Sequence, residues 1–469
     1  MPARRSSSAR RRPHRKSPVA IAAYHLLSRE ELERIGERIF RFSEADETEV
    51  SIEVRADALT RFANNVIHQN VAEHALTVSV RTVLDGRTAR ASTNRTDDES
   101  LRAVVRASAA LARVQPPNPD LLPMPGRQKI PVVHRYVEET ARATPADRAR
   151  TIARVTGLAE QRGQIAAGIF ATGAFQTALL NSRGLFACHE QTRAEFSVTV
   201  LDGDSSGWAK ANFPAIDEIR AEELAERASQ KARDSRHRIE IPPGRYTVIL
   251  EPAAVLDLVG FLFYDFSATA VADKRSCLTD RLGTQLFDPR ITIWDDVYHP
   301  LQTGPPFDGE GMPRQKVLLV ERGVPRALVY SRQTAHRLGA QPTGHGLPLP
   351  NEWGEAPFNL VFEGGSASLD AMIQSTGRGI LVTRFWYIRE VDPYRKILTG
   401  MTRDGTFLIE NGRITKAIKN FRFNQSLIEM LASVEDLGPA VRAAGEESFE
   451  MVVPPMKVRD FHFTEPTRF

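Results

Sequence analysis

The sequence predicts an α+β protein of two domains: an N-terminal α/β-type domain with an antiparallel sheet and flanking helices, and a C-terminal, mostly antiparallel β domain. The first half places helical patterns on either side of short strands. Among these, Glu47–Arg55 alternates polar and apolar residues, which is typical of a strand with one buried face. The second half is rich in β-branched runs and poor in helical patterns. We therefore expect two domains, residues 24–237 and 238–469, after a basic arm at residues 1–23.

Composition limits the classes of protein that are possible. The chain has 469 residues, of which 42% are hydrophobic and 26% charged, enough for two or three ordinary domain cores. The net charge is +4, but seven Arg and Lys residues and no acid lie within the first sixteen. Subtracting these seven from +4 leaves −3 for the remainder, so the body is not a basic nucleic-acid-binding surface.

The basic arm is expected to be disordered, because it is rich in Ser and Arg and lacks aromatic residues. One interpretation is a phosphate-binding tail running from Arg4 to Lys16. We favour the alternative, a solvated extension or an upstream start codon. The apolar run Val19–Leu27 does not predict a signal peptide, because His25 interrupts it and no small-residue cleavage site follows.

Cysteine usage and hydropathy indicate a cytoplasmic protein. Cys188 and Cys277 are the two cysteines in the sequence, too few for a disulfide scaffold. No hydrophobic span is longer than about 18 residues, so no membrane segment is expected.

The N-terminal domain begins with a helix whose Ser28 and Glu31 have capping-box spacing. Helices and strands then alternate in the order helix, strands, helix, twice over. The two halves echo each other loosely, without a residue-level period. The expected helices are Ser28–Phe42, Ser100–Val114, Pro145–Arg162 and Glu218–Arg233, and the expected strands are Glu47–Arg55, Leu59–His68, Ala75–Val83, Ile165–Gly173, Phe175–Asn181 and Ala194–Val200.

The C-terminal domain follows Pro242-Pro243-Gly244 and opens with a strand at Arg245–Leu250 that turns directly into a helix. Pro252 stands near the first helical position. Between Val255 and Phe263 only Asp257 is polar, so this helix is expected to be buried. Further expected strands are Ile291–Trp294, Gln315–Val320, Ala327–Tyr330, Phe358–Phe362, Gly379–Phe385 and Gly405–Ile409, and the other expected helices are Ser368–Thr376 and Ser426–Val434.

Several short motifs stand in a distinctive order along the chain. They are Arg61–Asn65, Val83–Arg87, Phe307–Gly311, Gly323–Val329, Thr334–Gly339, Thr343–Gly346 and Phe407–Ile414. In number and order they resemble the TldD/PmbA family over roughly residues 29–465. The resemblance implies a cytoplasmic bacterial or archaeal zinc-peptidase system, often a pair of paralogous subunits that enclose a cleft and trim unfolded or modified peptides.

The resemblance also implies where zinc is bound in the family. The metal-bearing subunit carries a His-Glu-x-x-x-His helix, in which two imidazoles bind zinc and the Glu activates water. In this chain the corresponding helix has Leu256, Asp257 and Phe261 at those positions. These side chains cannot form a zinc site. The chain is therefore expected to be the metal-free subunit, similar to the TldE/PmbA branch, with no catalytic residue or cofactor of its own and zinc on a TldD-like partner.

Two other groups are candidate sites. Cys188-His189-Glu190 brings thiol, imidazole and carboxylate together, but a strand would point His189 and Glu190 to opposite faces, so we favour surface residues at a strand end. Cys277 is expected to be a packed thiol. The acidic stretch from Asp295 to Glu310, which includes Asp308, has enough carboxylates for a hard cation. A shaped loop lining the cleft is the preferred interpretation.

A third, looser group joins His336, His345 and Arg384, which the resemblance places near the cleft as contacts for peptide or partner. Loop capping by the two histidines is an equal alternative. An aromatic group consists of Trp353, Phe385, Trp386 and Tyr387. It predicts either an interface hot spot or, slightly preferred, a core strand that ends in a packed Trp.

Three functions remain open on the sequence. The leading one is a non-catalytic subunit that pairs with a zinc-bearing paralogue and presents extended peptide to it by strand addition; a homodimer is also possible. The second is a stand-alone peptidase with an unrecognised site. The third is a nucleic-acid-associated regulator acting through the arm, which the −3 body does not support. The family also carries the name modulator of DNA gyrase, and no residue pattern here bears on gyrase.

Overall fold

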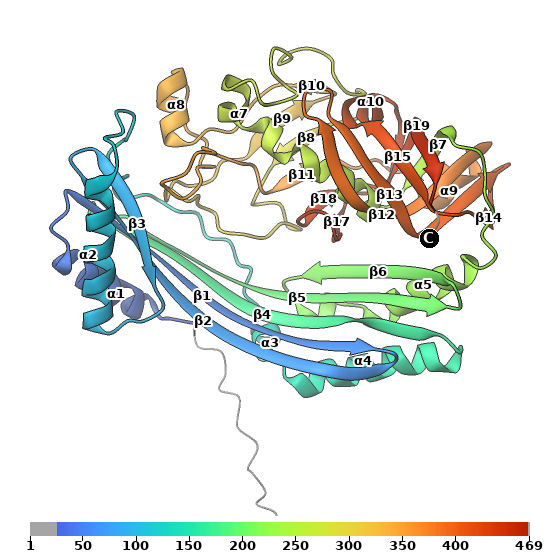
Figure 1. Cartoon of the computed structure of the whole chain (residues 1–469), viewed down its shortest axis with the longest axis horizontal. Coiled ribbons are helices and arrows are strands. Elements are labelled where there is room, and N and C mark those ends of the chain that lie inside the picture. Colours follow the sequence, from blue (N-terminus) through green and yellow to red (C-terminus); the bar gives the residue numbers. More distant parts are fainter. Residues whose placement is uncertain (1–25, 468–469) are drawn as a thin grey trace, which may run out of the picture.

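The computed structural model describes residues 26–467 and confirms the α+β class (Figure 1). An antiparallel sheet with its helices forms the N-terminal part, and two further sheets form the strand-rich C-terminal part. The predictions made for the arm at residues 1–23 lie outside the described residues. Within residues 26–467, no helix combines the length and the apolar character needed to cross a membrane.

The N-terminal sheet has the strand order β3-β2-β1-β4-β5-β6, and every pair in it is antiparallel. Its two halves repeat the order helix, three strands, helix, which is the echo expected from the sequence. They join at the centre, where β1 pairs with β4 from Glu49↔Asn181 to Phe62↔Gly168. The elements are α1 (Arg29–Phe42), β1 (Glu47–Ala63), β2 (Val66–Leu84), β3 (Arg87–Thr93), α2 (Asp98–Val114), α3 (Glu138–Ala141), α4 (Pro145–Gln161), β4 (Ile165–Asn181), β5 (Phe186–Asp202), β6 (Ser205–Phe213) and α5 (Ala221–Asp234).

Strands predicted as separate pieces are continuous. The expected strands Glu47–Arg55 and Leu59–His68 lie in β1 and the start of β2. The expected strands Ile165–Gly173 and Phe175–Asn181 are one strand, β4. The gap between the two expected strands in β1 falls at Ala56–Ala58. Both alanines are buried, and partners on both sides of β1 keep the backbone extended through them.

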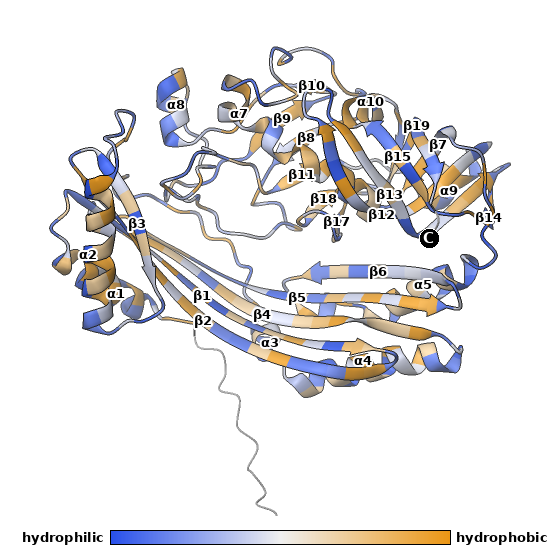
Figure 2. Ribbon diagram, in the orientation of Figure 1, coloured by the Kyte–Doolittle hydropathy of each residue, from blue (hydrophilic) through white to orange (hydrophobic). Residues whose placement is uncertain are grey.

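All four long helices cover one face of this sheet. Along β1, the residues from Val50 to Phe62 that point to this face are buried, whereas those pointing to the other face include the exposed Glu53 and Arg55. α1 and α2 pack on this face at one end, and α4 and α5 pack on it at the other. The alternation is visible along β1 in Figure 2. The opposite face is directed toward the C-terminal part (Figure 1).

The C-terminal part contains a sheet of order β12-β7-β19-β15-β13-β14 and a sheet of order β10-β9-β8-β11-β18-β17. Its elements are β7 (Gly244–Leu250), α6 (Pro252–Val259), α7 (Ala268–Ala272), β8 (Ile293–Asp295), β9 (Val317–Glu321), β10 (Val324–Pro325), α8 (Arg332–Leu338), β11 (Leu360–Phe362), α9 (Leu369–Gln374), β12 (Arg378–Asp392), β13 (Ile397–Glu410), β14 (Arg413–Ala417), β15 (Phe421–Ser426), α10 (Leu427–Ala432), β16 (Val434–Leu437), β17 (Val441–Ala443), β18 (Met451–Val453) and β19 (Met456–Pro466).

Helix α6 lies between these two sheets, in contact with β7 and β12 of one and with β17 and β18 of the other. Every residue from Ala254 to Val259 is buried, which confirms the prediction of a buried helix. The prediction of a strand at Ala327–Tyr330 is wrong, because this segment makes only a single bridge, between Val329 and Ser267. Helices α7 and α8 were not predicted; both are only one or two turns long and are held by serine caps at Ser267 and Ser331.

A buried ionic cluster lies on the face of the N-terminal sheet that is directed toward the C-terminal part. Arg81 makes two hydrogen bonds to the carboxylate of Glu49, at 3.1 and 2.8 Å, and Arg90 makes a third at 2.6 Å. Arg90 Nε also donates to the carbonyl of Leu349 in the C-terminal part at 2.8 Å. The cluster therefore joins all three strands of its half, β1, β2 and β3, to one another and to the C-terminal part.

The first prediction concerns this cluster. We expect Glu49→Gln to lower the free energy of unfolding by about 3 kcal/mol, because it leaves the buried Arg81 without its counter-charge. Urea unfolding measures the change. Glu53→Gln is the matched control, because Glu53 lies on the same strand and is exposed. Its free energy of unfolding is expected to stay within about 0.5 kcal/mol of that of the unmodified chain. Equal stability of the two variants would contradict the structural role of the cluster.

Candidate functional site

The candidate site lies where β7 turns into α6. Pro252 occupies the first helical turn after Glu251, as the sequence predicted, and α6 ends at Val259. The chain then tightens into a 3-10 turn, Gly260–Phe266. A β-carbon on Gly260 would come within 2.0 Å of Ser448 Oγ, so a glycine is required for the segment 446–449 to pack against the helix end.

The three positions that correspond to the zinc helix carry side chains with a packing role. Leu256 is fully buried in the core between the sheets. Phe261 stands beyond the end of the helix, partly buried against the same core. Neither has an atom that can bind a metal ion.

Asp257 is the polar exception and is also fully buried. Its carboxylate accepts hydrogen bonds from the backbone N–H groups of Phe385, at 3.2 Å, and Glu447, at 3.4 Å. Burial raises the pKa of Asp257 to about 7, against the opposing effects of the N–H donors and of Arg384. Asp257 thus joins α6 to β12 and to the segment that follows β17. The sequence around Asp257 does not indicate these contacts, because both partners lie far along the chain.

A pocket of about 580 Å³ opens beside this helix end. Its walls combine aromatic rings with carboxylates, and Phe263 stacks on Phe358 and meets Phe449 edge to face. Lys396, which lines the pocket, is paired with Asp265 and Glu390. The Glu447 carboxylate accepts hydrogen bonds from the backbone of β12. The charges on this wall are therefore largely used within the chain.

The residues at the helix do not fit zinc. Leu256 and Phe261 supply no ligand, and the Asp257 oxygens accept backbone hydrogen bonds. Across residues 26–467, no group of three or more His, Cys, Asp or Glu residues is arranged to hold a metal ion. No hydrolytic step through zinc is assigned to this chain.

Asp308 and Glu310 are both buried, beside Gly346. Asp308 accepts hydrogen bonds from the backbone N–H groups of Glu310, Met312 and Gly346, and Glu310 accepts one from Arg332 N–H. Burial raises the pKa of both carboxyls, and for Glu310 the neighbouring Asp308 charge adds to the effect, giving a pKa of about 7. These contacts hold the shape of a loop.

The structure does not bring His336, His345 and Arg384 together. His345 is fully buried, with Nε2 2.9 Å from Asp295 Oδ1 and Nδ1 2.9 Å from Thr343 Oγ1. His336 is exposed on α8. Arg384 lies on β12, in a buried ion pair with Asp404.

The aromatic group is also divided. Phe385 is buried and packs on Phe423 and Phe461. Tyr387 is exposed on the same strand, whereas Trp353 is exposed elsewhere, 5.1 Å from the ring of Tyr264. Cys277 is buried, as expected for a packed thiol.

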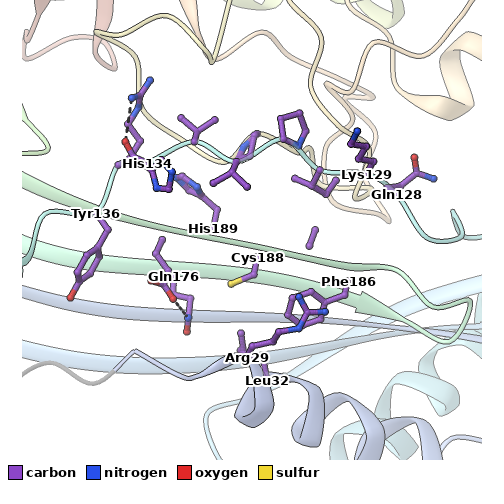
Figure 3. Close-up of a pocket in the computed structure, with 18 of the residues that line it drawn as sticks. Arg29, Leu32, Gln128, Lys129, His134, Tyr136, Gln176, Phe186, Cys188 and His189 are labelled. Atoms are coloured by element: carbon purple, nitrogen blue, oxygen red, sulfur yellow. Dashed lines mark hydrogen bonds between the residues drawn. The ribbon is translucent and has the colours of Figure 1, made fainter.

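The expectation for Cys188-His189-Glu190 is wrong in one respect. These residues lie within β5, not at a surface strand end, and His189 is only 6% exposed. The alternation is as predicted: Cys188 packs on the side of α1, and His189 points to the other face. All three line a pocket of about 830 Å³ (Figure 3). Period-two alternation in this stretch could have indicated the continuous strand.

The second prediction follows from Asp257. In the folded chain its pKa is about 7, whereas the ordinary value is 3.8. Between these values unfolding releases a proton, so rising pH favours unfolding. We expect the difference in unfolding free energy between the unmodified chain and Asp257→Asn to fall by up to about 1.4 kcal/mol per pH unit from pH ~4 to ~7, and to level off outside that window. Urea unfolding across this range measures it, and a flat difference would contradict the raised pKa.

Three profiles of the PmbA/TldA metallopeptidase family match the chain in succession: domain 1 at residues 48–112, the central domain at residues 120–236 and the C-terminal domain at residues 243–465. A metalloprotease from Methanothermobacter thermautotrophicus is 25% identical over 57% of this chain and 60% of its own length. A "Metalloprotease TldD homolog" from Haemophilus influenzae is 28% identical over 50% of this chain and 51% of its own. The aligned segments thus span little more than half of these curated relatives.

The fold has a solved counterpart. The crystal structure of TldE from Thermococcus kodakarensis superposes with a TM-score of 0.84 over 93% of this chain and 99% of that one, at 21% identity. At this identity the likeness concerns the fold. The three profiles, which together match most of the chain, show that it belongs to the TldD/PmbA family.

Proposed function

We propose that this chain is the metal-free, TldE/PmbA-like subunit of a TldD/TldE-type zinc metallopeptidase complex that trims unfolded or modified peptides. The observation that carries the proposal is the chemistry of α6. The helix that bears the zinc ligands in the family's peptidase subunit here carries Leu256 and Phe261, and its carboxylate, Asp257, is engaged by backbone N–H groups. Such a helix supports the fold and leaves hydrolysis to another chain.

The names of relatives support the idea of paired chains. Curated relatives include proteins named for TldD and for PmbA, and the structural counterpart is a TldE. We infer a TldD-like paralogue as the partner, with zinc bound on that paralogue, in the cytoplasm. The aromatic and acidic pocket beside Gly260 is the part of this chain that is proposed to shape the shared cleft.

The third prediction tests the partner and the metal together. Native mass spectrometry of the full chain, purified gently from its own host through a C-terminal tag, is expected to show a one-to-one complex with a second chain of similar size and one zinc ion. When the complex is dissociated in the gas phase, the zinc is expected to leave with the partner.

The same spectrum contains its own control, because this chain released from the complex is weighed beside the partner. Stoichiometric metal on this chain, in a homo-oligomer, would overturn the proposal and favour a stand-alone peptidase. Peptide hydrolysis by the complex, absent from this chain alone at equal concentration, is the expected activity.

A further inference from the structure

The 830 Å³ pocket lies at an open edge of the N-terminal sheet. β5 pairs with β4 along its whole length, but β6 covers the other edge of β5 only from Ala194 to Asp202. Beyond that, a parallel bridge between Arg135 and Gln191 ends the coverage. From Phe186 to Glu190, no strand of the described chain pairs with this edge of β5.

The direction of the backbone groups at this edge follows from one hydrogen bond. Thr192 N–H donates to the carbonyl of Arg135 at 2.9 Å, on the side away from β4. Because backbone groups alternate along a strand, Glu190, Cys188 and Phe186 direct their N–H groups to the same side. Those of Ala187 and His189 point to β4. The edge therefore offers outward N–H and C=O groups at Phe186 and Cys188 and a further N–H at Glu190.

The pocket is open on both faces of the sheet at this edge. Leu32 and Arg29 of α1 line it on the helix side, together with Cys188. On the other side it is lined by the extended segment 127–136, which packs through Ile130 against Ala187. A strand added at the edge directs alternate side chains to these two faces, so both faces would contact it.

The charge of the lining favours an acidic occupant. Arg29, Arg127, Lys129 and Arg135 contribute four cations, and Glu33 and Glu190 contribute two carboxylates. Glu33 is paired with Arg29, and Glu190 accepts a hydrogen bond from Gln176. Four cations against two carboxylates leave the lining with a net charge of 4 − 2 = +2. Arg127 and Lys129 are exposed on the extended segment.

One buried polar group in the wall lacks a partner. His189 is 6% exposed, and its Nε2 atom makes no hydrogen bond in the described structure. Figure 3 shows this side chain directed from β5 toward the segment that carries His134. Leaving a buried polar atom unpaired is costly, and a ligand that supplies a hydrogen bond removes that cost.

We propose that the edge of β5 from Phe186 to Glu190 binds an extended peptide with acidic side chains as an added strand. Backbone hydrogen bonds to Phe186, Cys188 and Glu190 hold the peptide, and the surrounding arginines and Lys129 select acidic side chains. This inference deepens the proposed function, because it assigns peptide capture to the metal-free subunit. Its test needs neither the partner nor zinc, so the two proposals can fail separately.

The fourth prediction is measured on the full-length chain alone. A fluorescein-labelled peptide of alternating valine and glutamate is expected to bind, as followed by fluorescence anisotropy. The same peptide with lysine in place of glutamate is expected to bind about tenfold more weakly, because the lining is cationic. Equal binding of the two peptides would overturn the charge selection.

Two variants locate the site. Cys188→Pro removes an outward N–H without removing a bond to β4, and edge strands tolerate such a proline; binding is expected to fall about tenfold. Arg29→Glu is expected to weaken the acidic peptide and strengthen the lysine peptide. Arg102→Glu is the matched control, because Arg102 on α2 also stacks over a phenylalanine ring, that of Phe42. This variant is expected to leave the binding of both peptides unchanged.

Hydrogen exchange at single-residue resolution separates strand addition from other modes of binding. The acidic peptide is expected to slow exchange at the amides of Cys188 and Glu190, while those of Ala187 and His189 are slow before and after its addition. If the Cys188 amide is already protected from exchange in the free chain and peptide does not change this, the edge would be assigned to pairing with the chain's own residues 1–25. Protection that rises with protein concentration would assign it to a second copy. Either result, or no protection, would overturn the proposal.

Discussion

The enclosure of α6 between two sheets is the constraint on which the C-terminal part depends. A helix with a sheet on each side has no solvent-exposed face, so apolar side chains are expected around its whole circumference. This explains why six consecutive residues from Ala254 are buried and why β7 can turn directly into the helix at Pro252. Asp257 is tolerated because two backbone N–H groups point at it and because protonation at a pKa of about 7 reduces the cost of its burial.

The N-terminal sheet depends on a different constraint, the unequal length of its strands. β5 has 17 residues and β6 has nine, so β6 cannot cover the whole of the neighbouring edge. The chain between α2 and α3 returns to that edge only at Arg135. A free edge invites pairing with another chain, and proteins normally cover or charge such edges. Here it is flanked by a pocket, which makes it a site for an added strand.

The sequence was sufficient for the fold class because its signals are local. The capping box at Ser28 and the proline at the start of α6 mark helix starts, and alternation at Glu47–Arg55 marks a strand. The continuity of β1 through Ala56 was missed because it is imposed by neighbouring strands. The partners of Asp257, 128 and 190 residues away, and the hydrogen bond of His345 with Asp295, 50 residues away, have no local signal at all. For the same reason, Arg384 and His345 were grouped, although Arg384 lies on β12 and His345 lies in a loop that contacts Asp295 of β8 in the other C-terminal sheet.

The acidic stretch from Asp295 to Glu310 links the two parts of the molecule. One end is held by the buried pair of Asp295 with His345 and the other by Asp308, which accepts three backbone hydrogen bonds. Between them, the His299 carbonyl accepts a hydrogen bond from Arg135, and Gly304 N–H donates to Gln191. Arg135 and Gln191 are the residues whose bridge ends the free edge of β5. A strand bound at that edge would therefore abut a loop anchored in the C-terminal sheets, so peptide capture on one part is mechanically joined to the part that carries α6.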